Sequence, residues 1–449
     1  MKEVSSSLLP SQSRPARCAA DLLLAWPREQ PLAALISGGA CNAQNQWSIL
    51  ARPSETIVLA AADSREGTLA ALDAALARTP RASHEQRHPE ARPDALPFTG
   101  GWLLALGYAL AESFEDRVVS RHRATREAPR AVLHWCDDAW CFHHASQTVH
   151  PVGNPPPLTI DAARAPWTLH ELTPQESDSH YASKVDRALA YIHAGDVYQA
   201  NIARRFDANF SGCVRSFAHA AITTNGSWFG ALMDLPHDAS VVSMSPELFV
   251  RIDATGHITT RPIKGTRPSE VHAAELLDSA KDAAELAMIV DLMRSDLGRI
   301  AEVGSVRVTD GRFLETHHTV HHGVAEICAQ LRSNTTWLDV LRATFPPGSV
   351  TGAPKVRAMQ VIDELESTQR GFYCGAMGFI SRSGTAAFNV AIRTAQLSAK
   401  VAPNAHRKLC YHAGCGIVAE SEAVAEVAET HAKVRALSRL TPSSRSMHD

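Results

Sequence analysis

A proline-rich segment, HPVGNPPPLTIDAARAP (150–166), divides the sequence into two regions with different patterns. Proline cannot donate a backbone hydrogen bond and does not continue a helix, so such a segment is typical of a connection between folded regions. Short strand-like runs precede it, and longer helical patterns follow it without a regular strand–helix–strand repeat. The sequence therefore predicts an α+β fold rather than a doubly wound parallel sheet. We expect an N-terminal region at 15–150, a linker at 151–168 and a larger domain at 169–440.

The periodicity of apolar residues gives the expected elements. We predict strands at 48–53, 56–61, 131–144, 198–210 and 241–252, and helices at 181–194, 273–297 and 421–437.

Composition excludes several classes of function. The 449 residues are 45% hydrophobic and 20% charged with a net charge of -3, which is ordinary for a globular protein. The absence of a long basic run disfavours nucleic-acid binding, and apolar runs such as 102–110 are too short to cross a bilayer. The nine cysteines show no CxxC spacing, and the start lacks a secretory pattern. We therefore expect reduced thiols and a cytoplasmic protein without nucleic-acid or membrane partners.

Lys264, in the segment RPIKGTRP (261–268), has two interpretations. A lysine is a nucleophile only when its amine is neutral, and a closed pocket lowers the pKa of an amine enough to supply that form near neutral pH. The alternative is a solvated lysine in a basic turn with Arg261 and Arg267. The segment alone leaves both open.

Two predicted helices each carry a pair of carboxylates three residues apart, which places each pair on one helix face. The pairs are Asp282 with Glu285 and Glu426 with Glu429. Mg²⁺ prefers a few carboxylate oxygens and leaves places for water and an anionic substrate, so both pairs are candidate metal ligands. The alternative is a solvated surface, because Glu429 and Lys433 have the spacing of an ordinary helical ion pair.

The segment FPPGSVTGAPKVRAMQVIDELE (345–366) is a glycine-rich loop that enters a helix. Backbone N–H groups at a helix start bind anions, and the absence of the GxxxxGK[ST] order favours a carboxylate over a phosphate. Arg393 is a candidate bidentate clamp for a carboxylate, with a surface ion pair as the alternative.

Two other patterns are interpreted as structural. The cluster HHTVHH (317–322) lacks the cysteine or HExxH partners of a zinc site. Cys415 lacks the GxCxGxQ pattern of a glutamine amidotransferase, so we expect it to be a small packing residue.

Taken together, long segments resemble the chorismate-utilising enzymes in one continuous order. They are GDVYQANIARRF (195–206), SMSPELF (243–249), RPIKGTRP, KDAAELAMIVDLMRSDLGR (281–299), HHTVH (317–321), FPPGSVTGAPKVRAM (345–359), GFYCGAMGFI (371–380), IRTA and AGCGIVAESE (413–422). The segments LISGG (35–39), SILARP and FTGGWLLALGY (98–108) resemble the N-terminal region of the family more loosely. This resemblance implies a large chorismate-binding fold with a β-sandwich core flanked by helices.

Two positions indicate which reaction of the family to expect. Members that add water to chorismate carry a lysine where this chain has Gln199, so amination is favoured. The PIKGT form around Lys264 resembles the aminodeoxychorismate synthases, whereas anthranilate synthases typically have alanine there. The resemblance thus implies conversion of chorismate and ammonia to 4-amino-4-deoxychorismate, for p-aminobenzoate and folate synthesis. Anthranilate synthase large subunit and a catalytically silent chorismate-binding protein are the alternatives.

The resemblance also implies residue roles. Lys264 would attack C2 of chorismate while the C4 hydroxyl leaves, with Glu247 as general acid or base, and ammonia would then expel the lysine. Glu285 and Glu429 would bind Mg²⁺ directly, with Asp282 and Glu426 holding its waters. The substrate pocket would contain Gln199, Gly265, Thr266, His318, Ser349, Thr351, Tyr373, Arg393, Gly414, Cys415, Gly416 and Lys433.

Two further expectations come from the resemblance. Because the chain has no amidotransferase signature, a separate glutamine amidotransferase subunit would supply ammonia. The element that helps to hold tryptophan in relatives reads Leu35-Ile36-Ser37 here, so a bound tryptophan is not expected. His321 and Cys415 also depart from the residues common in the family.

Overall fold

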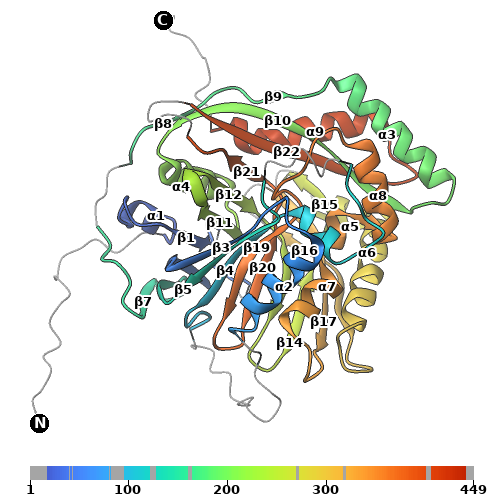
Figure 1. Cartoon of the computed structure of the whole chain (residues 1–449). Coiled ribbons are helices and arrows are strands. Elements are labelled where there is room, and N and C mark those ends of the chain that lie inside the picture. Colours follow the sequence, from blue (N-terminus) through green and yellow to red (C-terminus); the bar gives the residue numbers. More distant parts are fainter. Residues whose placement is uncertain are drawn as a thin grey trace, which may run out of the picture.

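Two large antiparallel sheets form the centre of the structure (Figure 1). The computed structural model describes residues 18–39, 41–42, 44–79, 81, 96–121, 128–159, 164–268, 273–316, 320–400 and 406–440. The first sheet has the order β18 (Gly352–Ala353), β10 (Gln199–Gly212), β22 (Arg407–Ile417), β21 (Thr394–Leu397), β12 (Ser240–Ser245), β11 (Phe229–Asp234), β1 (Ala33–Ile36), β2 (Trp47–Arg52), β6 (Asp138–His143) and β7 (Thr148–Val152), with β8 (Trp167–Leu169) and β9 (Thr173–Pro174) paired to β10. The second has the order β15 (Ile263–Pro268), β17 (Val320–Gln330), β14 (His257–Arg261), β13 (Leu248–Ile252), β20 (Ala386–Val390), β19 (Ala376–Ser381), β4 (Gly101–Leu106), β5 (Ala131–Cys136) and β3 (Glu55–Leu59), with β16 (Arg307–Thr316) paired to β17.

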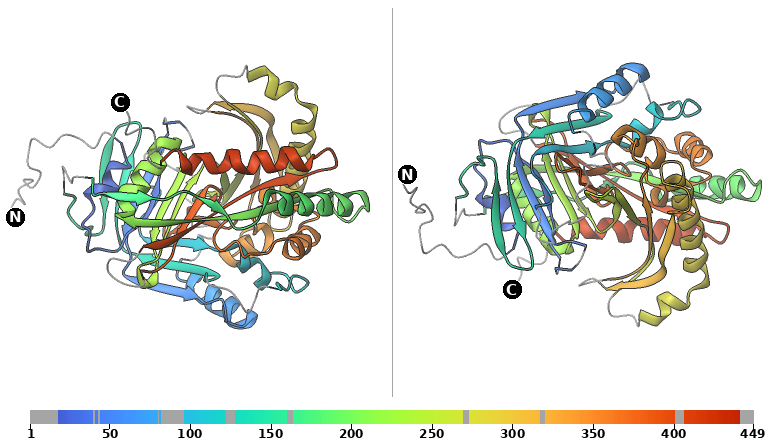
Figure 2. Two further views of the ribbon diagram at one scale, coloured as in Figure 1. Left: turned by 90° about the horizontal axis from the view of Figure 1, so that it is seen from above. Right: turned by 90° about the horizontal axis from the view of Figure 1, so that it is seen from below.

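Helices cover the outer faces of both sheets. They are α1 (Asp21–Ala25), α2 (Arg65–Leu76), α3 (Asp178–His193), α4 (Val214–Asn225), α5 (Ala273–Asp278), α6 (Ala280–Gly298), α7 (Trp337–Thr344), α8 (Lys355–Leu365) and α9 (Ala423–Ser438), with 3-10 turns at Tyr108–Ser113, Pro236–Asp238 and Gly348–Val350. The first sheet packs against α1, α4 and α9, and the second against α2, α6 and α7. Figure 2 shows α9 alongside β22, and α3 projecting beyond the sheets.

The strand β4 shows why the sequence makes a sandwich. All six of its residues are buried. Leu103 and Ala105 join a cluster that also contains Ala231 and Val241 of the first sheet, whereas Trp102 and Leu104 pack with α2 on the opposite face. Because side chains alternate across a strand, a strand covered on both faces is apolar throughout. The predicted α+β fold with a β-sandwich core flanked by helices is confirmed.

Strands from the N-terminal region belong to both sheets. β1, β2, β6 and β7 extend the first sheet, and β3, β4 and β5 extend the second. The predicted linker at 151–168 contains the end of β7 and the start of β8. Segments before and after this linker therefore contribute strands to the same two sheets.

Two predicted elements are wrong in detail. The run 131–144 is two strands in different sheets, β5 and β6, which separate at Asp137. The helical pattern at 273–297 is broken at Ser279, whose hydroxyl accepts a hydrogen bond from Asp282 N at 3.2 Å and so caps α6. The C-terminal helix matches α9 closely. Among the described residues, no helix is long and apolar enough to cross a membrane.

Candidate active site

Lys264 lies in β15, where its side chain meets the first sheet. A Cβ atom placed on Gly416 of β22 would lie 3.2 Å from Lys264 Nζ and 2.0 Å from Gln199 Nε2. A side chain at 416 would therefore displace the Gln199 amide and press against Lys264 Nζ. The predicted residues Gln199, Lys264 and Gly416 thus come together at one point between the sheets, from strands far apart in the sequence.

Gln199 is fully buried, yet neither Oε1 nor Nε2 of its amide has a hydrogen-bond partner in the described part of the chain. An unsatisfied buried polar group costs about 1–3 kcal/mol. The unpaired Gln199 amide beside the Lys264 amine can therefore form hydrogen bonds with a polar ligand that enters the site.

The environment of Lys264 favours the nucleophile over the solvated turn. Burial lowers the pKa of the Lys264 amine, and this effect exceeds the opposing attraction of the Glu285 and Glu247 carboxylates. The next residue, Gly265, has a φ of 80°, and a Cβ there would lie 2.7 Å from Leu276 Cδ1 and 2.9 Å from Asp282 Cγ. Glycine therefore fixes the backbone that directs Lys264.

Glu247 lies in the turn between β12 and β13 and is 3% exposed. Burial raises the pKa of its carboxyl to about 7, although Ser349 and Lys264 act to lower it. Its Oε1 accepts a long hydrogen bond of 3.4 Å from Ile263 N, one residue before Lys264. A carboxyl with this pKa can hold or release a proton near neutral pH, as a general acid or base must.

Three of the predicted metal ligands gather at an acidic edge of the site. Glu285 on α6 acts electrostatically on Lys264, and burial raises the pKa of Glu285. Glu426 on α9 is 6% exposed and also acts on Glu285. Glu429 pairs with Lys433 at 2.7 Å; burial acts to raise the pKa of Glu429, but Lys433 holds it below its usual value.

Asp282 differs from the other three carboxylates, because it pairs with Arg267 at 2.8 Å. Among the described residues, neither Glu285 nor Glu426 makes an ion pair with a cationic side chain. Carboxylate oxygens that are not held in an ion pair are suitable ligands for a hard divalent cation such as Mg²⁺, so the donor set fits that ion.

A second group of predicted residues lies near Lys433. Its Nζ donates to Gly414 O at 2.7 Å, and its backbone O accepts from the Tyr411 hydroxyl at 3.5 Å. Tyr411 also acts electrostatically on Arg393, whose pKa is lowered by burial. In the described part of the chain, the Arg393 guanidinium has no hydrogen bond or ion pair, which suits it to an anionic ligand.

The remaining predicted residues have protein partners. Tyr373 stacks on His412 with ring centroids 5.4 Å apart. The Thr351 hydroxyl donates to Pro347 O at 2.8 Å, and the Thr266 hydroxyl lies 2.8 Å from His322 Nδ1. His318 lies outside the described residues. Cys415 is 1% exposed and packs in the core, as predicted.

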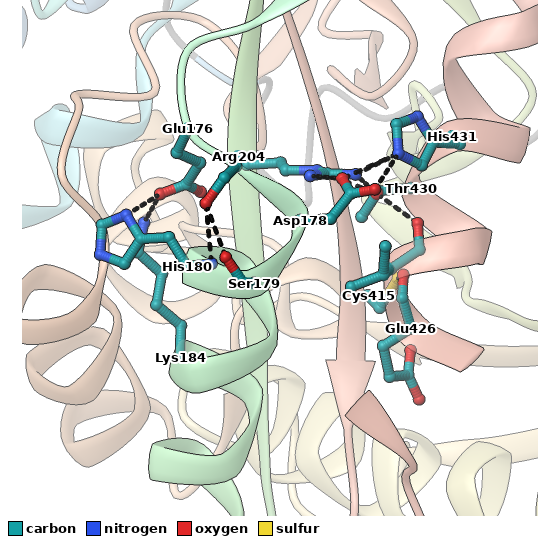
Figure 3. A network of polar contacts seen from close by, with 12 residues as sticks. Glu176, Asp178, Ser179, His180, Lys184, Arg204, Cys415, Glu426, Thr430 and His431 are labelled. Atoms are coloured by element: carbon teal, nitrogen blue, oxygen red, sulfur yellow. Dashed lines mark hydrogen bonds and ion pairs between the residues drawn. The ribbon is translucent and has the colours of Figure 1, made fainter. Parts of the chain in front are cut away.

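Two buried arginines that support the site were not predicted from the sequence. Arg204 on β10 bonds Thr430 Oγ1 at 2.8 Å and His431 Nε2 at 2.9 Å, and so attaches α9 to the first sheet immediately after Glu429 (Figure 3). Arg370 pairs with Glu366 at 2.6 Å and donates to Asn201 O and Val350 O. The partners of Arg204 and the carbonyl acceptors of Arg370 are distant in sequence, so no local pattern identifies them, whereas Glu366 is only four residues before Arg370.

Comparisons with known proteins show the family of the whole chain. Residues 39–439 match the model of the chorismate binding enzyme family. The chain is 38% identical to aminodeoxychorismate synthase component 1 of Klebsiella aerogenes over 90% of this chain and 92% of that protein. It is 35% identical to the protein of the same name in Salmonella typhimurium, over 97% of this chain and 98% of the relative. The crystal structure of anthranilate synthase component I from Streptococcus pneumoniae superposes with a TM-score of 0.71 and 26% identity, covering 89% of this chain and 94% of that one.

The chain therefore belongs to the chorismate binding enzymes. Within that family, it is 35–38% identical over most of its length to three enzymes named aminodeoxychorismate synthase component 1, and it is an enzyme.

Proposed function

We propose that this enzyme converts chorismate and ammonia to 4-amino-4-deoxychorismate through a covalent adduct on Lys264. The observation that carries the proposal is the Lys264 amine, whose pKa is lowered by burial beside Gln199 and the carboxyl of Glu247. A neutral amine in a water-poor pocket is a nucleophile.

The proposed reaction has two halves that balance. In the first, the Lys264 nitrogen forms a bond to C2 of chorismate, both ring double bonds shift by one position toward C4, and the C4–O bond breaks. Glu247 gives its proton to the departing hydroxyl, which leaves as water. In the second, ammonia forms a bond to C4, both double bonds return to their original positions, and the C2–N bond to Lys264 breaks, which releases the neutral lysine amine. Two successive displacements of this kind, one that removes the hydroxyl from C4 and one that adds ammonia to C4, retain the configuration at C4.

Other residues would bind the two carboxylates of the substrate. Arg393, which lacks a protein partner among the described residues, would clamp one carboxylate together with Tyr373 and the backbone N–H groups of Gly414–Gly416. Glu285 and Glu429 would bind Mg²⁺ directly, with Asp282 and Glu426 holding its waters. The ion would neutralise the ring carboxylate. Asp282 would need to share its present ion pair with Arg267.

We also propose that a separate glutamine amidotransferase subunit supplies the ammonia. The support for this is a sequence that lacks the GxCxGxQ pattern, and a Cys415 that is buried in the core instead of lying on a strained, exposed turn.

The product formed from chorismate tests the proposal. With Mg²⁺ and ammonium at alkaline pH, the purified chain is expected to make 4-amino-4-deoxychorismate, and glutamine alone should not replace ammonium. Chromatographic retention and mass identify the product. Anthranilate, which is fluorescent, or isochorismate as the main product would contradict the proposal.

The pH dependence of the rate tests Glu247. Its carboxyl is protonated below a pKa of about 7 and loses the proton above it. Glu247→Gln is expected to slow turnover by roughly 10²–10⁴-fold, the usual contribution of a general acid. The ratio of wild-type to variant rates should be largest below about pH 7 and should fall as pH rises, because the wild type then loses its acid. Comparing the two proteins at each pH removes the titration of ammonia itself. A ratio that is constant with pH would contradict the acid role.

A further inference from the structure

Cys415 contacts the start of helix α9 as well as the hydrophobic core. Along β22, Gly414 and Gly416 present their backbone to the inner face, where Gly416 meets Gln199 and Lys264. Because strand residues alternate between faces, Cys415 points to the opposite side. There its Sγ donates a hydrogen bond to the backbone O of Glu426 at 3.5 Å, and Figure 3 shows it beside the start of α9.

The thiol of Cys415 and the carboxylates of Glu426 and Glu429 form one cluster. Each residue can offer a ligand atom such that all three atoms lie within 4.8 Å of one another. A tetrahedral ion with Zn–S of about 2.3 Å and Zn–O of about 2.0 Å would hold neighbouring ligands roughly 3.5 Å apart. Small rotations of the side chains would therefore bring the three atoms onto one ion.

A second observation points to a cation at the same place. Glu426 is nine-tenths buried, and within the described chain it makes no ion pair with a cationic side chain. The Glu426 carboxylate interacts directly with the Cys415 thiol, both through its charge and as a side-chain hydrogen-bond partner. A buried carboxylate outside an ion pair is unfavourable, and the longer-range attraction of Lys433 offsets only part of that cost, so a bound cation would lower it further.

We propose that Cys415, Glu426 and Glu429 form a binding site for a soft divalent cation such as Zn²⁺. On binding, the thiol proton passes to solvent, the sulfur bonds the ion as a thiolate, and the two carboxylates complete three protein ligands. Glu429 would exchange its ion pair with Lys433 for the metal, while Lys433 keeps its bond to Gly414 O. A thiolate selects zinc-like ions over Mg²⁺, which prefers oxygen.

This site has a consequence that rests on the proposed function. Glu426 and Glu429 are also assigned to the Mg²⁺ site, so binding of one ion should lower the affinity for the other. Zn²⁺ would then inhibit the Mg²⁺-dependent amination of chorismate, and excess Mg²⁺ would relieve the inhibition.

Titration of the metal-free chain with Co²⁺, a spectroscopic substitute for Zn²⁺, tests the site without any turnover. A cysteine ligand should produce a sulfur-to-cobalt charge-transfer band that Zn²⁺ and excess Mg²⁺ both suppress. Cys415→Ser and Cys415→Ala should lose the band, with circular dichroism confirming the fold. Two controls should keep it: Cys410→Ser on the same strand, and Cys18→Ser, whose thiol lies near Asp21 and His219 in another metal-capable cluster.

The outcomes separate the two proposals. A band that persists in Cys415→Ser, or one that is lost in Cys18→Ser, would overturn the site, and a band unaffected by Mg²⁺ would overturn the sharing of ligands. In the amination assay, each variant is compared with its own uninhibited rate, and Cys415→Ala should need at least about tenfold more Zn²⁺ for half-inhibition. The Co²⁺ result stands even if the chain makes a product other than 4-amino-4-deoxychorismate.

Discussion

Lys264→Ala is expected to slow formation of the 4-amino product by more than about 10³-fold, the scale of loss when a catalytic nucleophile is removed. The reason is geometric as well as chemical. Lys264 Nζ lies beside Gln199 and the backbone of Gly416, and burial lowers its pKa. Water or ammonia in the enlarged pocket would have to attack without the adduct. Residual product should shift toward the anthranilate-type isomer, because ammonia can then attack C2 directly.

A matched control comes from Lys281, an exposed lysine on α6 that also acts on Glu285. Lys281→Ala removes a nearby positive charge without touching the proposed nucleophile, so it should keep a rate within a few-fold of the wild type. Mass spectrometry gives an independent readout. With ammonia withheld, wild-type protein should carry a chorismate-derived mass increase on the peptide that spans 262–267. A Lys264→Ala enzyme that makes the 4-amino product at the wild-type rate would exclude the covalent route.

Local patterns in the sequence predict the α+β class, whereas the β-sandwich is implied by the resemblance to the chorismate-utilising enzymes, and its strand β4 was not predicted from periodicity. Strand β4 is apolar throughout, and a strand of that kind must be covered on both faces. The division of 131–144 between two sheets was not predictable in the same way. Asp137 and Asp138 interrupt its apolar pattern, but a polar break of this kind does not indicate that the flanking strands belong to different sheets, which only the packing of the two sheets determines.

The candidate site shows the same limit. The i, i+3 spacing correctly places Glu426 and Glu429 on one face of a helix, where both reach the cluster with Cys415. The same spacing suggests equal roles for Asp282 and Glu285, but Asp282 pairs with Arg267 because the backbone at Gly265 brings β15 against α6. Pairings of this kind join strands and helices that are distant in sequence, so local patterns do not reveal them.

Glu285→Gln is expected to reduce turnover at a fixed low Mg²⁺ concentration by more than about 100-fold, because an amide is a poor ligand for Mg²⁺ and loss of metal-site groups costs 10–100-fold or more. Burial raises the pKa of Glu285, which shows that its charged form is unfavourable in the metal-free protein. Removing that charge should therefore leave the melting temperature of the metal-free chain unchanged or slightly higher.

The melting temperature then separates a metal ligand from a residue of the helix surface. An ion that binds only the folded state at 100 times its dissociation constant stabilises it by about 2.7 kcal/mol, so Mg²⁺ should raise the melting temperature of the wild type. Glu285→Gln should lose most of that increase. Asp291→Asn, at an exposed acid on the same helix that pairs with Arg294, should keep the increase and the activity. If Mg²⁺ stabilises Glu285→Gln as strongly as the wild type, Glu285 is not a ligand, and the acidic edge must serve the positive charges of Lys264 and Lys433 instead.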